Sequence, residues 1–174
     1  LIGYRKSSDA TLKIAHCQTT ACTTSSTSIL ENSGNVGLHT SIAVGTDGLG
    51  ILSYYDAVSG DLEIAHCNNT SCSSADINSI DTTVDVGQYS AIAIGNDGLP
   101  LISYYDSTNN DLKVAHCSNI ICSATDSVEI IDSIGDVGKQ TSIAIGIDGR
   151  GLISYYDASN KDLKVAHCEN VSCS

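Results

Sequence analysis

The sequence lacks tryptophan, phenylalanine and methionine altogether, and its 174 residues include a single proline. Its larger apolar side chains are therefore isoleucine, leucine, valine and eight tyrosines. A chain of this kind has to bury many small β-branched side chains in closely stacked layers, which favours sheets packed on sheets. The scarcity of bulky side chains thus indicates an all-β fold.

Basic residues are also scarce, because Lys and Arg number 8 against 20 Asp and Glu, a formal net charge of −12. Phosphate binding needs clustered basic side chains, so we expect no nucleic-acid partner. No apolar run approaches the roughly 18–20 residues that span a bilayer, so we expect no membrane insertion. The chain starts at Leu1 without a recognisable leader, from which we expect a removed leader or a piece of a longer protein.

What the sequence does contain is one motif in four copies. The clearest copy is ISYYDSTNNDLKVAHC, and the copies lie at 102–117, 153–168, 52–67 and, in diverged form, 2–17. Their shared histidines are His16, His66, His116 and His167. The spacings of 50, 50 and 51 residues are typical of solenoids, propellers or arrays and leave room for four short strands per unit.

The third unit shows the expected strands, which are 89–95, 99–106, 111–117 and 127–132. An Asp-Gly turn separates the first two. The first strand has the smallest side chains and the fourth is the most polar, which indicates a propeller blade with the first strand at the axis and the fourth at the rim. We therefore predict a β-propeller of four-stranded antiparallel blades in one repeat domain. About three and a half blades are expected, at 1–37 (partial), 38–87, 88–138 and 139–174 (partial).

These motifs resemble those of repetitive bacterial secreted β-propellers with SYYD…DLKVAHC repeats, and more loosely those of kelch and sialidase-type propellers. The resemblance covers essentially the whole chain and implies the propeller fold. It does not imply sialidase activity, because the turns GTDGLG, GNDGLP and GIDGRG lack the Ser and Trp of the sialidase Asp-box. Arg5 and Arg150 are also the only arginines, too few for a sialidase arginine triad.

Eight cysteines form four Cys-x4-Cys pairs, namely Cys17/Cys22, Cys67/Cys72, Cys117/Cys122 and Cys168/Cys173. An even number at regular spacing predicts four local disulfides and an extracellular or cell-surface location. The alternative is a zinc site in each unit, built for example from His116, Cys117 and Cys122. Adjacent residues of a strand point to opposite faces, which works against shared ligation by His116 and Cys117.

Aspartates bracket the loop between the second and third strands of three units, at Asp56, Asp61, Asp106, Asp111, Asp157 and Asp162. With Asp85, Asp136 and the second tyrosine of each pair, they should share one face of the propeller. Those tyrosines, Tyr55, Tyr105 and Tyr156, are candidate ligand-binding residues. The aspartates have two interpretations: they cap turns through backbone N–H groups, or they form Ca²⁺ sites together with loop carbonyls.

The recurring histidines are expected to be core positions that hydrogen-bond to a neighbouring blade. Every candidate residue recurs three or four times, whereas catalysis usually needs one unique set, so we expect no enzymatic activity. The first hypothesis is a secreted, non-catalytic scaffold that self-associates through its blades or packs against the remainder of a longer chain. The alternative is a multivalent lectin-like or cation-binding propeller with one weak site per blade, which would bind glycans.

Overall fold

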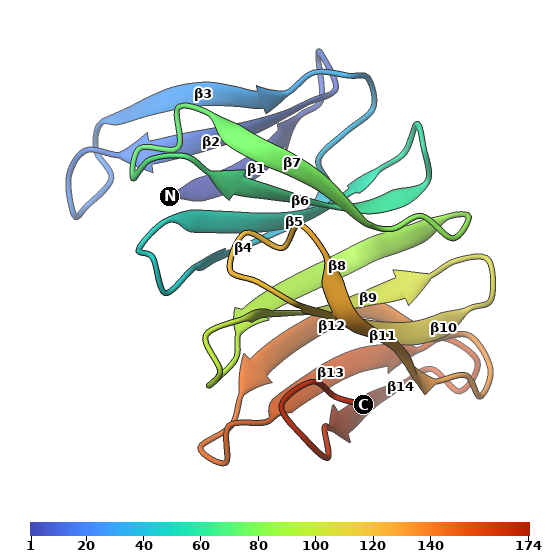
Figure 1. Ribbon diagram of the computed structural model, residues 1–174. Coiled ribbons are helices and arrows are strands. Elements are labelled where there is room, and N and C mark those ends of the chain that lie inside the picture. Colours follow the sequence, from blue (N-terminus) through green and yellow to red (C-terminus); the bar gives the residue numbers. More distant parts are fainter.

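The computed structural model describes residues 1–174 as fourteen β-strands in four antiparallel sheets (Figure 1). The first sheet has β1 (Ile2–Lys6), β2 (Thr11–Cys17) and β3 (Ser25–Glu31). The second has β4 (Leu38–Val44), β5 (Gly50–Asp56), β6 (Asp61–Cys67) and β7 (Ala75–Asp81). The third has β8 (Val86–Ile94), β9 (Pro100–Asp106), β10 (Asp111–Cys117) and β11 (Thr125–Asp132). The fourth has β12 (Val137–Ile145), β13 (Gly151–Asp157) and β14 (Asp162–His167).

Within each sheet the strands follow one another in chain order, so every sheet is a simple meander. The strands expected in the third unit correspond to β8, β9, β10 and β11, with ends that differ by at most a few residues. The prediction of an all-β propeller is confirmed. The structure has no helix that is long and apolar enough to cross a membrane.

The Asp-Gly turns form as their sequence predicts. In the third sheet, Gly98 has a φ of 82°, in the left-handed region that glycine adopts without strain. The carboxylate of Asp97 accepts a hydrogen bond from the backbone N–H of Leu99 at 3.0 Å. The side chain thus caps the turn, and β8 and β9 are joined as a tight hairpin.

Neighbouring sheets pack face to face, because side chains alternate between the two sides of each strand. We call the side of a sheet that meets the next sheet its leading face and the opposite side its trailing face. At the centre of the molecule, Leu62 and Ile64 on the leading face of the second sheet pack against Ile102, Tyr104 and Ala115 on the trailing face of the third. All five side chains are fully buried. Burial of each Leu or Ile contributes about 1.5–3 kcal/mol, so these faces stabilise the stack.

Glycine is required where the first strand of one sheet crosses the third strand of the preceding sheet. A Cβ at Gly87 would lie 2.6 Å from Leu62 Cα, and one at Gly138 would lie 2.7 Å from Leu112 Cα. Both glycines also have a φ of 101°. The recurring glycine therefore sets how closely consecutive sheets approach.

The first strands of three sheets lie side by side, as expected for strands at a propeller axis. Ser90 Oγ on β8 donates to the carbonyl of His39 on β4 at 3.0 Å. Thr141 Oγ1 on β12 donates in turn to the carbonyl of Tyr89 at 2.9 Å. These bonds connect β4, β8 and β12 around the axis.

All eight cysteines are in disulfides, and each bond joins a cysteine to the one five residues later, as predicted. The Cα–Cα distances are 4.6–5.0 Å. Cys67, Cys72, Cys117 and Cys122 are fully buried between sheets. The zinc alternative is therefore wrong, because the sulfurs that it needs are bonded to one another.

Candidate functional site

Each junction between sheets contains a tyrosine that reaches a carboxylate of the preceding sheet. Tyr104 on β9 is fully buried, and its hydroxyl donates to Asp81 Oδ2, at the end of β7, at 2.6 Å. Lys113 Nζ lies 2.5 Å from the same oxygen and 3.9 Å from Asp106 Oδ2. Burial disfavours the charge on Asp81, but hydrogen bonds from Lys113 and Thr83 outweigh it and lower the pKa of Asp81. The junction therefore encloses an ion pair.

The next junction repeats this arrangement with equivalent residues. The hydroxyl of Tyr155 donates to Asp132 Oδ2 at 2.7 Å, and Lys164 Nζ forms an ion pair with the same oxygen. Lys164 Nζ also lies 3.9 Å from Asp157. Two of the three junctions thus place a lysine ammonium between two aspartates.

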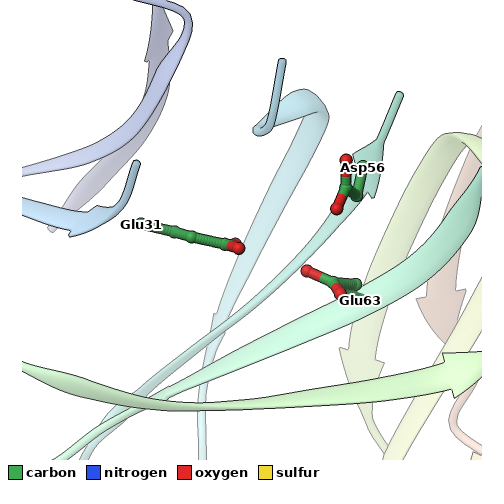
Figure 2. Close-up of side chains that lie close together, drawn as sticks. All are labelled: Glu31, Asp56 and Glu63. Carbon is green, nitrogen blue, oxygen red and sulfur yellow. The ribbon is translucent and has the colours of Figure 1, made fainter. Parts of the chain in front are cut away.

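The first junction is different, because Glu63 stands at the sequence position of Lys113 and Lys164. Three carboxylates come together there: Glu31 from β3, Asp56 from β5 and Glu63 from β6. Figure 2 shows the three side chains pointing toward one another. One oxygen of each lies within 4.8 Å of the others, and Asp56 and Glu63 are buried. We call Glu31, Asp56 and Glu63 the acidic triad.

The acidic triad is organised around one hydroxyl group. Tyr54 Oη contacts Glu31 Oε2 and lies 2.7 Å from Glu63 Oε2. A hydroxyl has one hydrogen to donate, so hydrogen bonds to both acids require a proton on a carboxyl group. Burial, followed by the negative charges of Glu31 and Asp56, raises the pKa of Glu63. A triad of this kind lowers its repulsion by binding a proton or a hard cation, and carboxylate oxygens are the ligands that Ca²⁺ prefers.

Three of the six predicted calcium ligands, Asp56, Asp106 and Asp157, cap turns. The bracketing aspartates face each other across the hairpin in the pairs Asp56/Asp61, Asp106/Asp111 and Asp157/Asp162. Asp106 Oδ1 accepts backbone N–H groups of Thr108 and Asn109 at 3.0 Å each, and Asp157 Oδ1 accepts that of Asn160 at 2.9 Å. Of the six, Asp56 alone belongs to a group of three potential metal ligands. Calcium binding stays a prediction, and the acidic triad is where the structure concentrates its ligands.

The second tyrosines of the SYYD motifs lie beside the loops between sheets. The hydroxyl of Tyr55 donates to Asp85 at 2.5 Å, and that of Tyr105 donates to Asp136 at 2.9 Å. Burial and these carboxylates raise the pKa of both tyrosines to about 12. Tyr55 and Tyr105 are buried, whereas Tyr156 on the last sheet is 37% exposed. Ligand binding at these three residues also stays a prediction.

Three of the four recurring histidines, His66, His116 and His167, contact aspartates of their own sheets, not of a neighbouring blade. His66 Nε2 lies 2.9 Å from Asp47 Oδ2, and His116 Nε2 lies 2.8 Å from Asp97 Oδ2. In each case the aspartate belongs to the Asp-Gly hairpin between the first two strands of the same sheet. The expectation of a bond between blades is therefore corrected: the histidine ties the first hairpin to the end of the third strand.

A pocket of about 260 Å³ opens where β4, β8 and β12 meet at the axis. Its lining consists of His39, Thr40, Tyr89, Ser90, Gln140 and Thr141. We call it the axial pocket. Each of three repeats contributes two residues, and these occupy equivalent positions in the repeats. Three sheets therefore form the pocket together.

Three residues of the axial pocket share an unusual backbone conformation. His39, Tyr89 and Gln140 have φ angles of 54°, 54° and 52°, in the left-handed region that non-glycine residues rarely adopt. The strand pairing shifts register across this position in β4, β8 and β12. Such bulges redirect side chains, and strained residues gather at functional sites.

The side chains of the axial pocket are not equivalent, although their positions are. The rings of His39 and Tyr89 are 4.3 Å apart between centroids and tilted by 49°. Burial lowers the pKa of His39, which favours the neutral imidazole near pH 7. Gln140 supplies an amide at the third position. The pocket lining therefore contains two aromatic rings and an amide.

These residues are absent from the expected sites, because those sites consist of residues that the repeats share. The signal was present in what they do not share. The segments GLHTSIAVG, GQYSAIAIG and GKQTSIAIG share a common pattern but have His, Tyr and Gln at the third position, and Leu, Gln and Lys at the second. A position that varies among otherwise similar repeats gives the ring of sheets its asymmetry.

The fold and the axial pocket define this chain as part of a β-propeller. No protein-family model matches it, and no curated protein matches its sequence. Its structure is similar to that of a protein of unknown function from Dyadobacter fermentans, with a TM-score of 0.69 and 11% identity over 95% of this chain and 50% of that one. It is also similar to an α-L-arabinofuranosidase from Lactobacillus brevis, with a TM-score of 0.53 and 12% identity over 78% of this chain and 50% of the enzyme. A thermostable family-43 glycoside hydrolase gives 0.52 and 11%, over 80% and 50%.

The chain thus spans about half the length of these structures, and at such low identity the similarity establishes the fold. The similarity also corrects the expectation that the chain is not an enzyme. That expectation rested on the repeats and on the absence of a unique set of residues. Glycoside hydrolases have the same propeller fold, and the axial pocket supplies a unique set.

Proposed function

We propose that this protein binds carbohydrate in the axial pocket. The observation that carries the proposal is the pocket's asymmetry: three equivalent bulged positions hold His39, Tyr89 and Gln140 in strained left-handed conformations. Strain of this kind costs about 1–3 kcal/mol per residue and persists where the surrounding structure enforces it. Presentation of three different side chains to one ligand is a function that accounts for this cost.

The chemistry of the pocket suits a sugar. Tyr89 and His39 offer ring faces for the C–H groups of a pyranose or furanose ring. Gln140 offers both a donor and an acceptor. The hydroxyl groups of Thr40, Ser90 and Thr141 donate to backbone carbonyls, so they offer acceptor oxygens to a sugar. The volume of about 260 Å³ is slightly below that of sites for drug-sized ligands, and it matches one terminal sugar unit better than a long chain segment.

Two further facts support the proposal. The arabinofuranosidase and the family-43 hydrolase act on glycosides with a propeller of the same fold, and an engineered GH43 enzyme of similar structure has endo-xylanase and exo-arabinofuranosidase activity. Arabinose- and xylose-containing oligosaccharides are therefore the first ligands to test. The four disulfides indicate an oxidising environment. The disulfides thus support a location outside the cell or at its surface, where such polysaccharides are accessible.

Isothermal titration calorimetry with a panel of arabinose- and xylose-containing oligosaccharides tests the proposal. We expect one site per axial pocket, and Tyr89→Ala or Gln140→Ala should weaken binding at least tenfold. Tyr156→Ala is the matched control, because Tyr156 is an exposed tyrosine outside the pocket, and it should leave the affinity unchanged. Binding by the wild type that neither pocket substitution affects would refute the proposal, as would the absence of binding across the panel.

The same titration separates the axial pocket from the multivalent alternative. One site for each of Tyr55, Tyr105 and Tyr156 would give three equivalents of ligand per chain. Incubation of the panel with the protein, followed by measurement of released reducing sugar, determines in the same samples whether the bound glycan is also cleaved. Loss of release in Tyr89→Ala would assign that activity to the same pocket.

A further inference from the structure

We propose that Tyr55 and Tyr105 are positioning residues of the axial pocket, which hold its lining in place and do not contact the ligand. Neither tyrosine lines the pocket, and both side chains are buried, with 9% and 3% exposure. Each tyrosine nevertheless contacts two elements that carry pocket residues. The inference rests on the proposed carbohydrate binding and adds the residues that keep the pocket in shape.

The ring of each tyrosine packs against the pocket residue of its own sheet. Tyr55 on β5 lies 6.4 Å from His39 on β4, measured between ring centroids, and Tyr105 on β9 lies 6.2 Å from Tyr89 on β8. At such distances tilted aromatic rings attract each other. In both sheets the tyrosine is paired with the residue just before the pocket residue, at the edge of the bulge. The tyrosine ring therefore supports the pocket residue from within its own sheet.

The hydroxyl group of each tyrosine reaches the next sheet. Tyr55 Oη donates to Asp85 Oδ1 at 2.5 Å, and Tyr105 Oη donates to Asp136 Oδ1 at 2.9 Å. Each aspartate immediately precedes the first strand of its sheet and lies four residues before the pocket residue of that strand. Each tyrosine thus contacts one pocket residue directly and holds the start of the strand that carries the next one.

The first junction keeps the same contact with different residues. Arg5 occupies the sequence position of the tyrosines, and Asn35 occupies that of the aspartates. Arg5 Nη2 donates to Asn35 Oδ1 at 2.6 Å, and Asn35 lies four residues before His39. Because both partners differ while the contact remains, the position of the contact matters more than its chemistry. We call the pairs Arg5–Asn35, Tyr55–Asp85 and Tyr105–Asp136 the three tethers.

The pocket residues need support of this kind. His39, Tyr89 and Gln140 have left-handed backbone conformations, which persist only where the surrounding structure enforces them. One tether lies close to the start of each of the three strands that carry these residues. The three tethers therefore fix the relative placement of the three different side chains that the pocket presents.

A double-mutant cycle tests whether a tether acts through the pocket. Tyr55→Phe keeps the ring and removes the hydroxyl that holds Asp85, and it should weaken the binding of arabinobiose and xylobiose about fivefold. In a Tyr89→Ala background the same substitution should change the affinity by less than about twofold, because the residue that the tether positions is already absent. Isothermal titration calorimetry measures the four affinities. Additive effects of the two substitutions would overturn the inference.

Replacement of the aspartate separates the tether from other roles of Tyr55. Asp85→Ala should weaken binding as Tyr55→Phe does. Asp85→Asn should bind more tightly than Asp85→Ala, because an amide oxygen still accepts the hydrogen bond, as Asn35 accepts that of Arg5. Tyr156→Phe is the matched control, since Tyr156 has the same place in its motif but contacts no aspartate of a following sheet, and it should bind as the wild type does. Equal weakening in Tyr156→Phe, or equal affinities of the two Asp85 variants, would overturn the inference.

Nuclear magnetic resonance of the histidine side chains tests the tether without a ligand. The ring centroids of His39 and Tyr89 are 4.3 Å apart, so the imidazole signal of His39 depends on where β8 places Tyr89. Asp85→Ala leaves both rings in the protein and should shift this signal. The signals of His66 and His116, which lie on third strands, should stay in place and show that the fold is kept.

An unshifted His39 signal in Asp85→Ala would overturn the inference. A shifted signal in a protein whose wild type binds neither sugar would support the tethers and refute the proposed carbohydrate binding at the same time. The two proposals therefore fail separately.

Discussion

Lys113 and Asp81 form a buried ion pair between the second and third sheets, with 2.5 Å between Nζ and Oδ2. The side chains are 10% and 4% exposed, so solvent screens their attraction little. The same pair recurs between the third and fourth sheets as Lys164 and Asp132. Its absence from the first junction, where Glu63 replaces the lysine, makes the three junctions electrostatically different.

Removal of one partner of this pair should be costly. In Lys113→Ala, the buried Asp81 loses its cation but stays within a sheet junction, and we expect a loss of about 3 kcal/mol in the free energy of unfolding. Lys161→Ala serves as the control, because Lys161 is an exposed lysine in a hairpin loop and should cost under about 0.5 kcal/mol. Urea denaturation of both variants measures the difference, and equal midpoints would show that the pair contributes nothing.

Glu63→Lys should make the first junction resemble the other two. The new ammonium would lie between Glu31 and Asp56, as Lys113 lies between Asp81 and Asp106. Replacement of three clustered carboxylates by two carboxylates and a cation should stabilise the fold by about 2 kcal/mol. For a chain of this size that corresponds to a rise of about 5 °C in melting temperature.

Scanning calorimetry measures this rise, and Glu129→Lys is the matched control. Glu129 lies in β11 and shares no contact with the acidic triad, so the control makes the same change in net charge elsewhere. If both variants showed the same rise in melting temperature, the change in net charge would be its cause, and the role of the triad would be contradicted.

The raised pKa of Glu63 also predicts a pH dependence of stability. Because burial and the neighbouring carboxylates raise it above the ordinary value of 4.5, the folded state binds this proton more tightly than the unfolded state. The resulting stabilisation is complete below about pH 4.5 and is lost as the pH rises through the raised pKa. For Asp81 and Asp132 the pKa is lowered, so their stabilisation is present above about pH 3.8 and is lost on acidification.

Melting temperatures between pH 3 and pH 8 should therefore show a maximum in the mildly acidic range. In Glu63→Gln the decline toward neutral pH should become shallower, because the titrating group is gone while its size is kept. The fall in melting temperature toward pH 3 should be the same as in the wild type, since Asp81 and Asp132 remain. An identical decline in the wild type and in Glu63→Gln would assign it to other groups.

The calcium hypothesis can be tested at the same position. If Ca²⁺ binds the acidic triad, millimolar CaCl₂ should raise the melting temperature of the wild type by mass action on the folded state. The rise should disappear in Glu63→Lys, whose ammonium would fill the space between the carboxylates. Asp106→Asn with Asp111→Asn should leave the rise intact, whereas loss of the rise in that double variant would instead support binding at the bracketing aspartates.

Each disulfide should stabilise the protein separately. Replacement of Cys117 and Cys122 by Ala opens one six-residue loop, which should cost about 2 kcal/mol on the loop-entropy model, plus the contacts of two buried sulfurs. The less buried pair of Cys17, which is half-buried, and Cys22, which is exposed, is the comparison, and its removal should cost less because less buried volume is lost. Thermal unfolding of both double variants ranks them, and the reverse order would contradict this account.

The sequence by itself determined the strands, the blades and the disulfides of this protein. A period of about 50 residues, an Asp-Gly turn and alternating apolar side chains are local signals, and Cys-x4-Cys spacing favours a local bridge within each loop. These local signals recur in each unit, so four copies support the same prediction of strands and disulfides. The expected partners of His66 and His116 were residues of a neighbouring blade. Their actual partners, Asp47 and Asp97, lie in the same sheet as the histidines.

Tertiary structure alone decided which residues meet between units. The axial pocket joins His39, Tyr89 and Gln140, which are about 50 residues apart, and each of them lies where the first strand of its sheet bulges. The acidic triad likewise joins Glu31 of one unit to Glu63 of the next. Repetition within the sequence determines the strands, turns and disulfide of each sheet. The packing of one sheet on the next determines which of the differing residues come into contact.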